Sequence, residues 1–289
     1  MDIRKMTARP GGKVKLGRFD PAYTGKFKGK KNAQKKLAID IQKMFDLQDM
    51  LYAYDKYSVL IILQAMDAAG KDSVIKHVMS GLNPQGCKVV SFKEPSANEL
   101  DHDYLWRCMR SLPERGRIGI FNRSYYEEAL VVRVHPEILK AQKIPPELEK
   151  KSIWKERFED INNFEKYLTR NGTVILKFFL NVSKEEQKKR FLSRIDNASK
   201  NWKFSHADVK ERMLWDRYIE AYEDMLTHTS TGHAPWHIIP ADHKWFTRAA
   251  VAHTIVSRLK KLKMRYPVVS KRKKEELQKA KRILQRQKG

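Results

Sequence analysis

The amino-acid sequence predicts an α/β fold with a parallel five-stranded sheet flanked by helices. Five short apolar runs, at residues 59–63, 87–92, 118–121, 173–180 and 236–239, have the length and composition of buried strands. Segments with helical periodicity separate these runs. Strands that alternate with helices form a parallel sheet covered on both sides, because each helix returns the chain across one face of the sheet.

The predicted helices follow from apolar spacing and from residues typical of helix ends. Ser183 and Glu186 form a capping box at the start of one helix, and Asn171 with the glycine after it suits the end of another. Asn98, followed by Asp101, predicts the start of a third. The helices are expected at residues 31–54, 73–79, 98–109, 153–168, 183–194, 209–225, 244–263 and 271–288.

The composition is strongly basic. The 289 residues include 59 Lys and Arg against 34 Asp and Glu, a formal net charge of +25, while 41% are hydrophobic. This balance predicts a globular chain with a polyanionic partner: nucleic acid, an acidic membrane or a phosphate polymer. Only two cysteines occur, the start lacks a signal peptide, and no apolar run reaches the ~20 residues that cross a bilayer. We therefore expect a cytoplasmic protein without a membrane partner.

The chain divides into a main domain and two basic ends. Residues 1–30 are rich in Lys, Arg and Gly without a clear period, which predicts a basic arm laid over the surface or partly mobile. Residues 31–265 are expected to form one domain. Residues 266–289 are expected to form a charged C-terminal helix.

A loop rich in small residues follows the first predicted strand and leads into a helix. This is the layout of a phosphate-binding loop, in which backbone N–H groups and the helix start surround phosphates and Lys71 reaches the terminal ones. Ala65 occupies the place of the usual first glycine, and an aspartate directly follows the lysine. The alternative is an ordinary strand-to-helix turn with an exposed lysine. The phosphate-binding residues predicted in this loop are Ala68, Ala69, Gly70, Asp72 and Ser73.

Ligands bind beyond the carboxyl ends of the strands in such a sheet, so the segments that follow several strands should converge there. Arg123 follows the third strand, where it could grip phosphate or form a structural ion pair with a carboxylate. Asn122 stands where an acid usually supports Mg²⁺, so the metal must depend on Asp67, phosphate oxygens and water. Glu127 and Glu128 could assist the metal or lie on the surface.

The segment at about residues 183–215 is predicted to be a lid. Its basic helix, with Lys200 and Lys203, is the densest positive cluster near the expected site. Closure of the polar stretch 197–205 would exclude water and bring cations to a transferring phosphoryl group. An ordinary helical hairpin with a solvated basic face is the alternative.

Several motifs together resemble the polyphosphate kinase 2 family over roughly residues 30–265. The motifs lie at residues 66–73, 81–86, 121–128, 131–136, 201–205, 234–236 and 241–244. The resemblance implies a P-loop kinase-like catalytic core of the thymidylate-kinase type with a helical lid. It also implies Mg²⁺-dependent transfer of phosphoryl groups between inorganic polyphosphate and nucleotides, by a dimer or a tetramer.

The resemblance also implies roles for single residues. Asp67 would hold the metal and handle the nucleophile, Lys71 would grip phosphate, and Arg123 would act with them in catalysis. Asn122 stands where many members have an aspartate. With this residue the chain resembles the subgroup that phosphorylates both nucleoside mono- and diphosphates. The further expected phosphate contacts are Arg133, Arg190, Arg194 and Lys203.

The expected function is therefore a polyphosphate-dependent nucleotide phosphotransferase. It would reversibly transfer the terminal phosphoryl group of inorganic polyphosphate to AMP and ADP, with ATP as a product. An ATP-dependent nucleotide or metabolite kinase is one alternative. A basic nucleic-acid-binding protein with a vestigial loop is another, but the sequence lacks the RNA-binding RNP motif, which makes nucleic acid an unlikely partner.

Overall fold

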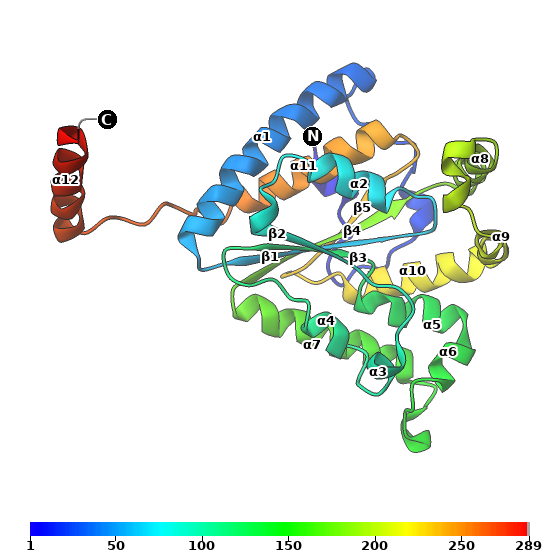
Figure 1. Ribbon diagram of the computed structural model, residues 1–289. Helices are drawn as coiled ribbons and strands as arrows, with labels where there is room; N and C mark the ends of the chain where they lie inside the picture. Colours follow the sequence, from blue (N-terminus) through cyan, green and yellow to red (C-terminus); the bar gives the residue numbers. More distant parts are fainter. Residues whose placement is uncertain (288–289) are drawn as a thin grey trace.

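A computed structural model describes residues 1–287 and confirms the parallel five-stranded sheet (Figure 1). The strands are β1 Ser58–Ala65, β2 Cys87–Ser91, β3 Ile118–Asn122, β4 Thr173–Asn181 and β5 Trp236–Pro240. Their spatial order is β2-β3-β1-β4-β5, and every neighbouring pair is parallel. All eight residues of β1 are buried, because β1 lies at the centre of the sheet and helices cover both of its faces.

Helices form one layer on each face of the sheet. Helices α1, α2 and α11 lie together on one face, and α5, α7 and α10 lie on the other (Figure 1). The helices are α1 Lys30–Tyr54, α2 Lys71–Val78, α3 Ala97–Leu100, α4 Trp106–Met109, α5 Val131–Val134, α6 Pro136–Lys140, α7 Ile153–Arg170, α8 Lys184–Ile195, α9 His206–Met213, α10 Trp215–Thr229, α11 Lys244–Lys260 and α12 Lys271–Arg286.

Two predicted helices are each broken in two. The segment 98–109 forms α3 and α4, and the capping box of α3 begins at Ser96 rather than at Asn98. The segment 209–225 lies in α9 and α10, which meet at Leu214. Apolar spacing continues across both breaks, so periodicity alone did not reveal them. The predicted end of the last helix, Lys288, lies outside the described residues.

The N-terminal arm is packed more deeply than predicted. Met6, Ala8, Val14 and Leu16 are buried in the hydrophobic core. Residues of the arm run along β5, where the Ala8 backbone N–H donates to the Trp236 carbonyl over 2.9 Å. The arm therefore covers an edge of the sheet that would otherwise expose unpaired backbone groups.

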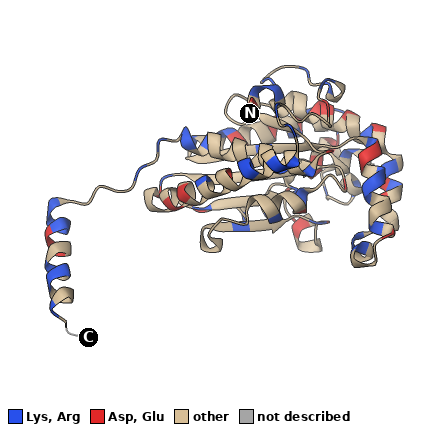
Figure 2. Cartoon of the chain, turned by 90° about the horizontal axis from the view of Figure 1, so that it is seen from above, with Lys and Arg blue, Asp and Glu red and all other residues tan. Residues whose placement is uncertain are grey.

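Helix α12 stands away from the rest of the chain and is rich in Lys and Arg (Figures 1 and 2). Every residue of the helix is exposed, and its ion pairs, from Arg272 and Lys273 to Glu276, lie within the helix. Among the described residues, no helix is both long enough and apolar enough to cross a membrane.

Candidate active site

A cavity of about 810 Å³ opens at the carboxyl ends of β1, β2 and β3. The loop predicted to bind phosphate, the end of β3 and the segment α8–α9 line it, as does the first residue of α11. Its charged lining is mostly basic. The basic residues are Lys71, Lys93, Arg123, Lys189, Arg190, Arg194, Lys200, Lys203 and Lys244, and the acidic residues are Asp67, Asp72, Glu186 and Asp208. Such a lining attracts polyanions.

The loop between β1 and α2 forms one wall of the cavity. Its backbone turns at Ala68, with φ of 59°, and at Gly70, with φ of 115°, a conformation that side chains with a Cβ rarely adopt. Helix α2 begins directly after Gly70. Lys71 donates from Nζ to the Ala65 carbonyl over 2.8 Å, and burial lowers its pKa against the opposing pull of Asp67. The predicted phosphate loop is thus formed as a strand, a tight turn and a helix start.

Two predicted loop residues differ in their surroundings. Ala69 is buried and does not line the cavity, and its carbonyl accepts a hydrogen bond from Arg190 over 2.8 Å. Ser73 lines the cavity, and its hydroxyl accepts a hydrogen bond from Arg248 over 2.8 Å. Any role of Ala69 toward phosphate is therefore indirect, through the shape of the loop.

Arg123 joins the end of β3 to the loop. Its Nη2 donates to Oδ1 of Asp67 over 3.2 Å, and its backbone N–H donates to the Leu63 carbonyl over 3.1 Å. Burial acts to lower the pKa of Arg123, but Glu127 and Asp67 outweigh it and hold the pKa above its usual value. Arg123 has φ of 64°, which is uncommon for a residue other than glycine. The structure thus contains the ion pair that was the alternative interpretation, and it leaves the guanidinium at the cavity wall.

Asn122 ends β3 beside the loop. Its Nδ2 donates to Oδ1 of Asp72 over 2.9 Å and to the Ser91 hydroxyl over 3.4 Å. Its Oδ1 is buried and accepts no hydrogen bond from the described residues. Amide and carboxylate oxygens are ligands that Mg²⁺ accepts. Asp67 and Asn122 both line the cavity, and the Asp67 carboxylate with the unpaired Oδ1 of Asn122 fits a metal that takes its other ligands from substrate and water. Within residues 1–287, no group of three or more His, Cys, Asp or Glu is arranged to hold a metal by itself.

Two predicted phosphate contacts, Arg190 and Arg133, also pair with groups of the protein. Arg190 is buried, and its guanidinium makes five hydrogen bonds to protein acceptors; these are the carboxylate of Glu186 and the carbonyls of Ala68, Ala69, Ala241 and Asp242. Its N–H groups are thus occupied in fixing the loop, although the side chain borders the cavity. Arg133 pairs with Asp224 and does not line the cavity. Protein acceptors thus occupy all five N–H groups of Arg190, whereas Arg133 donates one N–H group to Asp224. A contact of either guanidinium with phosphate stays a prediction.

The two acidic residues after β3, Glu127 and Glu128, lie in different surroundings. Glu128 is buried and pairs with Arg157 over 2.9 Å, away from the cavity, so it neither lies on the surface nor assists a metal there. Glu127 lines a small neighbouring cavity with Asp67 and Arg123. Burial raises the pKa of Glu127, while Arg123 and Lys71 act against this rise.

The predicted lid covers one side of the cavity. Lys200 and Lys203 lie on the 3₁₀ helix η6, Ala198–Lys203, between α8 and α9, and both line the cavity with Arg194 of α8. Nη1 of Arg194 lies 3.5 Å from Oδ2 of Asp208 at the start of α9. Trp202 is 79% exposed although it borders the cavity. The structure thus brings the predicted lid cations to the site, and closure of the lid stays a prediction.

Sequence reasoning assigned no role at the site to several charged lining residues, among them Lys93, Lys244 and Asp208. Lys93 follows the end of β2, Lys244 begins α11 shortly after β5, and Asp208 lies in the first turn of α9. The rule that points to strand ends could have identified Lys93 and Lys244. Asp208 had no such signal, because the fold of the lid alone brings it to the cavity.

Comparisons with known proteins agree with this architecture. A sequence model of the family described as "Polyphosphate kinase 2 (PPK2)" matches residues 28–267. The chain is 52% identical to an "ADP-polyphosphate phosphotransferase" of Rhodopseudomonas palustris over 92% of this chain and 93% of the relative. It is 44% identical to an "AMP/ADP-polyphosphate phosphotransferase" of Meiothermus ruber, over 92% of this chain and 96% of the relative.

A solved structure gives the same result at the level of the fold. The crystal structure of polyphosphate kinase 2 from Arthrobacter aurescens superimposes with a TM-score of 0.83 at 36% identity, over 91% of this chain and 94% of that one. The family model, the relatives and the shared fold confirm the resemblance drawn from the motifs. The chain belongs to the polyphosphate kinase 2 family.

Proposed function

We propose that this chain transfers the terminal phosphoryl group of inorganic polyphosphate to AMP and ADP, reversibly, in the cavity at the carboxyl ends of β1 and β3. The observation that carries the proposal is the charge of that cavity, whose lining has nine basic residues against four acidic ones around a phosphate-binding loop. Polyphosphate is a linear polyanion, and a groove rich in Lys and Arg attracts such a polymer by releasing its counterions.

Two observations support AMP and ADP as the acceptors of the phosphoryl group: the names of the relatives and the presence of Asn122. The name of one relative joins ADP to polyphosphate, and the name of the other joins AMP and ADP to polyphosphate. Asn122 leaves one fewer negative charge at the strand end than an aspartate would, and its amide donates to Asp72. We infer that this end of β3 tolerates both the shorter and the longer phosphate chain of the acceptor.

The transfer is an in-line displacement that needs positioning and charge neutralisation rather than a nucleophilic side chain. An oxygen of the nucleotide's terminal phosphate forms a bond to the end phosphorus of the polymer. The bridging P–O bond breaks, and the shortened polymer leaves with its electron pair. Lys71 and Arg123 line the cavity where the phosphates would lie, and their positive charges would stabilise the equatorial oxygens of the group in transit.

A divalent metal is a general requirement of kinases, and we propose Mg²⁺. The Asp67 carboxylate would hold it, with Oδ1 of Asn122 as a second protein oxygen. When bound, the metal would neutralise charge on the phosphates. Arg123 already pairs with Asp67, so this residue also keeps the carboxylate turned toward the cavity.

We place the reaction in the cytoplasm, where the nucleotide substrates occur, and both cysteines are free thiols, as in a reducing compartment. The family resemblance also implies a dimer or a tetramer. Light scattering coupled to gel filtration would measure the mass of the assembly directly.

A donor-swap assay tests the proposed function. Purified protein is given AMP or ADP with Mg²⁺ and either polyphosphate or ATP as donor, and the nucleotides are separated by chromatography. We expect ADP from AMP and ATP from ADP with polyphosphate, and no product with Lys71→Ala. Turnover with ATP alone as donor would favour the ordinary nucleotide kinase. No turnover, together with tight binding of nucleic acid that Lys71→Ala leaves unchanged, would favour the binding protein.

A further inference from the structure

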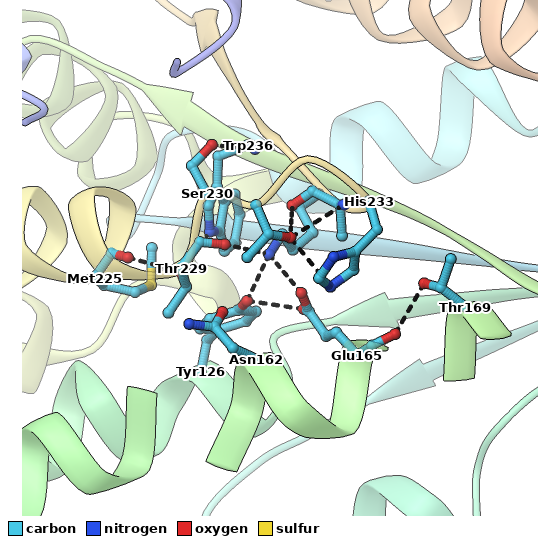
Figure 3. Close-up of polar contacts among 12 residues, drawn as sticks. Tyr126, Asn162, Glu165, Thr169, Met225, Thr229, Ser230, His233 and Trp236 are labelled. Carbon is cyan, nitrogen blue, oxygen red and sulfur yellow. Dashed lines mark hydrogen bonds and ion pairs between the residues drawn. The ribbon is translucent and has the colours of Figure 1, made fainter. Parts of the chain in front are cut away.

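A buried polar network lies beneath the segment that carries Arg123. At its centre, Lys177 of β4 donates from Nζ to Oε2 of Glu165 over 2.6 Å, to the Tyr126 hydroxyl over 2.8 Å and to the Thr229 carbonyl over 2.7 Å. Oε1 of Glu165 accepts from the hydroxyls of Tyr125 and Tyr126, over 2.9 and 2.8 Å. Figure 3 shows Glu165, Tyr126 and Thr229 converging from different elements.

The buried ammonium at the centre of this network has a hydrogen-bond partner for each of its donors. Lys177 and Glu165 are both 0% exposed, and the three donors of the ammonium each have an acceptor. Burying two charges in an apolar core is costly, and replacing such a pair by apolar residues is often no worse for stability. Burial lowers the pKa of Lys177, against the pull of Glu165. Stability alone therefore does not explain why a charged pair is buried at this position.

The network does not reach the substrate. None of its residues lines the large cavity, so none of them can contact phosphate there. It ties together four elements instead: β4 through Lys177, α7 through Glu165, the end of α10 through Thr229, and the 3₁₀ helix η4, Tyr125–Ala129, through two tyrosines. Of these elements, η4 lies nearest in the chain to Arg123, because it begins two residues after it.

Arg123 stands two residues before Tyr125 and has φ of 64°. Such a conformation is disfavoured for a long side chain and persists only where the surroundings fix it. On its N-terminal side, Arg123 is held by the hydrogen bond from its backbone N–H to Leu63. On its C-terminal side, the adjacent Ser124 is buried, and the two tyrosine hydroxyls anchor η4 to Glu165.

We propose that Lys177, Glu165 and the hydroxyls of Tyr125 and Tyr126 are positioning residues, which hold the backbone of Arg123 so that its guanidinium faces the cavity beside Asp67. The inference rests on the proposed function, because it assigns Arg123 to the phosphoryl-transfer site. Positioning of this kind affects the rate strongly, since a misplacement of about 1 Å at a reacting centre can cost about a hundredfold.

Removing single hydroxyls tests the proposal with little change in the volume of the core. We expect Tyr126→Phe to lower kcat about tenfold with KM for the nucleotide within about twofold of the wild-type value. Tyr125→Phe, which loses only the bond to Glu165, should have a smaller effect in the same direction. The matched control is Tyr104→Phe, which removes a hydroxyl from a half-buried tyrosine outside the network and should leave kcat unchanged. Thermal melting of each variant shows that it is folded.

A double-mutant cycle separates positioning of Arg123 from a general structural role. In an Arg123→Ala background, Tyr126→Phe should lower kcat no further, because the residue that the network positions is already gone. The inference would be overturned if Tyr126→Phe lowered kcat by the same factor in both backgrounds. It would also be overturned if the substitution left kcat unchanged in the wild-type background. Rates are compared with whichever donor the wild-type chain uses, so a failure of polyphosphate as donor would count against the proposed function alone.

Discussion

The guanidinium of Arg123 lies 3.2 Å from the carboxylate of Asp67, across the gap between the end of β3 and the loop after β1. The two strands are neighbours, with Leu63 paired to Asn122 in register, so the pair follows from the order of the strands. Both side chains are partly exposed at the cavity. The contact therefore joins the cation proposed to meet phosphate to the carboxylate proposed to hold the metal.

Arg123→Gln should lower kcat at least about a hundredfold, because it removes a positive charge aimed at the transferring group. The matched control is Arg133→Gln, which makes the same change at a predicted contact that the structure pairs with Asp224. The control should cost about 1 kcal/mol of stability or less, with unchanged kcat/KM. Steady-state kinetics and urea unfolding of both variants decide the matter, and a large kinetic loss in Arg133→Gln would restore the original assignment.

Lys71→Ala should abolish turnover and leave the fold intact, since Lys71 contributes one hydrogen bond to the Ala65 carbonyl and otherwise faces the cavity. Lys76→Ala, on the same helix but exposed and outside the cavity lining, is the control and should keep the wild-type rate. Coupled ATP detection and circular dichroism measure the two effects. Near-normal turnover in Lys71→Ala would refute the phosphate-loop assignment.

The lid cations should govern the salt dependence of polyphosphate use. Replacing Lys200 and Lys203 together by Gln should raise KM for polyphosphate and make the slope of log(kcat/KM) against log[salt] shallower by about 1 to 2, because each phosphate contact releases about 0.7 to 0.9 counterions. The control replaces Lys150 and Lys151, which are exposed and lie outside the cavity lining. An equal change in slope in both double variants would show a general charge effect rather than a lid contact.

Acid should weaken the anchoring of the N-terminal arm. The Nδ1 atom of His237 lies 3.0 Å from the Thr7 hydroxyl, and burial, reinforced by Arg258 and Lys177, lowers the pKa of His237 to about 4. A histidine with a lowered pKa in the folded state takes up its proton more readily when unfolded. Stability is therefore fully present above pH 6.5 and is lost as the pH falls toward 4, by up to about 3 kcal/mol.

Urea unfolding between pH 7 and pH 4 measures this loss. His237→Asn should be less stable than the wild-type protein at pH 7 and should show a shallower decline toward acid, because it has no ring to protonate. The same decline in both proteins would assign the acid sensitivity to other groups.

A chain that ends at residue 267 should keep the melting temperature and the turnover of the full chain. The residues of α12 are exposed throughout, and the family model ends at residue 267. Tyr266, whose hydroxyl donates to Asp49, remains in the shortened chain. A drop of several degrees in melting temperature would show that the last helix packs on the body in solution.

Local patterns determined the strands, most of the helices and the phosphate loop. A buried strand needs an apolar run and a tight turn needs small residues, so the segments around Leu63 and Gly70 could be predicted from their own neighbours in the chain. The placement of Arg123 at the site also followed, because strands in a parallel sheet end at one edge.

The tertiary structure alone decided how the charged residues divide their work. Arg190 and Arg194 lie one turn apart on a basic helix, and both border the cavity. The guanidinium of Arg190 donates to Glu186 and to carbonyls of the loop after β1 and of the segment after β5, whereas Arg194 pairs with Asp208 of the lid. In the sequence, Lys177 is a lone cation within an apolar strand. The fold places Glu165 next to its ammonium, and the hydroxyls of Tyr125 and Tyr126 donate to the same carboxylate. The sequence determined which residues carry charge and where strands end. Only the packing of distant segments determined which charges are already neutralised, because a hydrogen bond depends on distance in space and not along the chain.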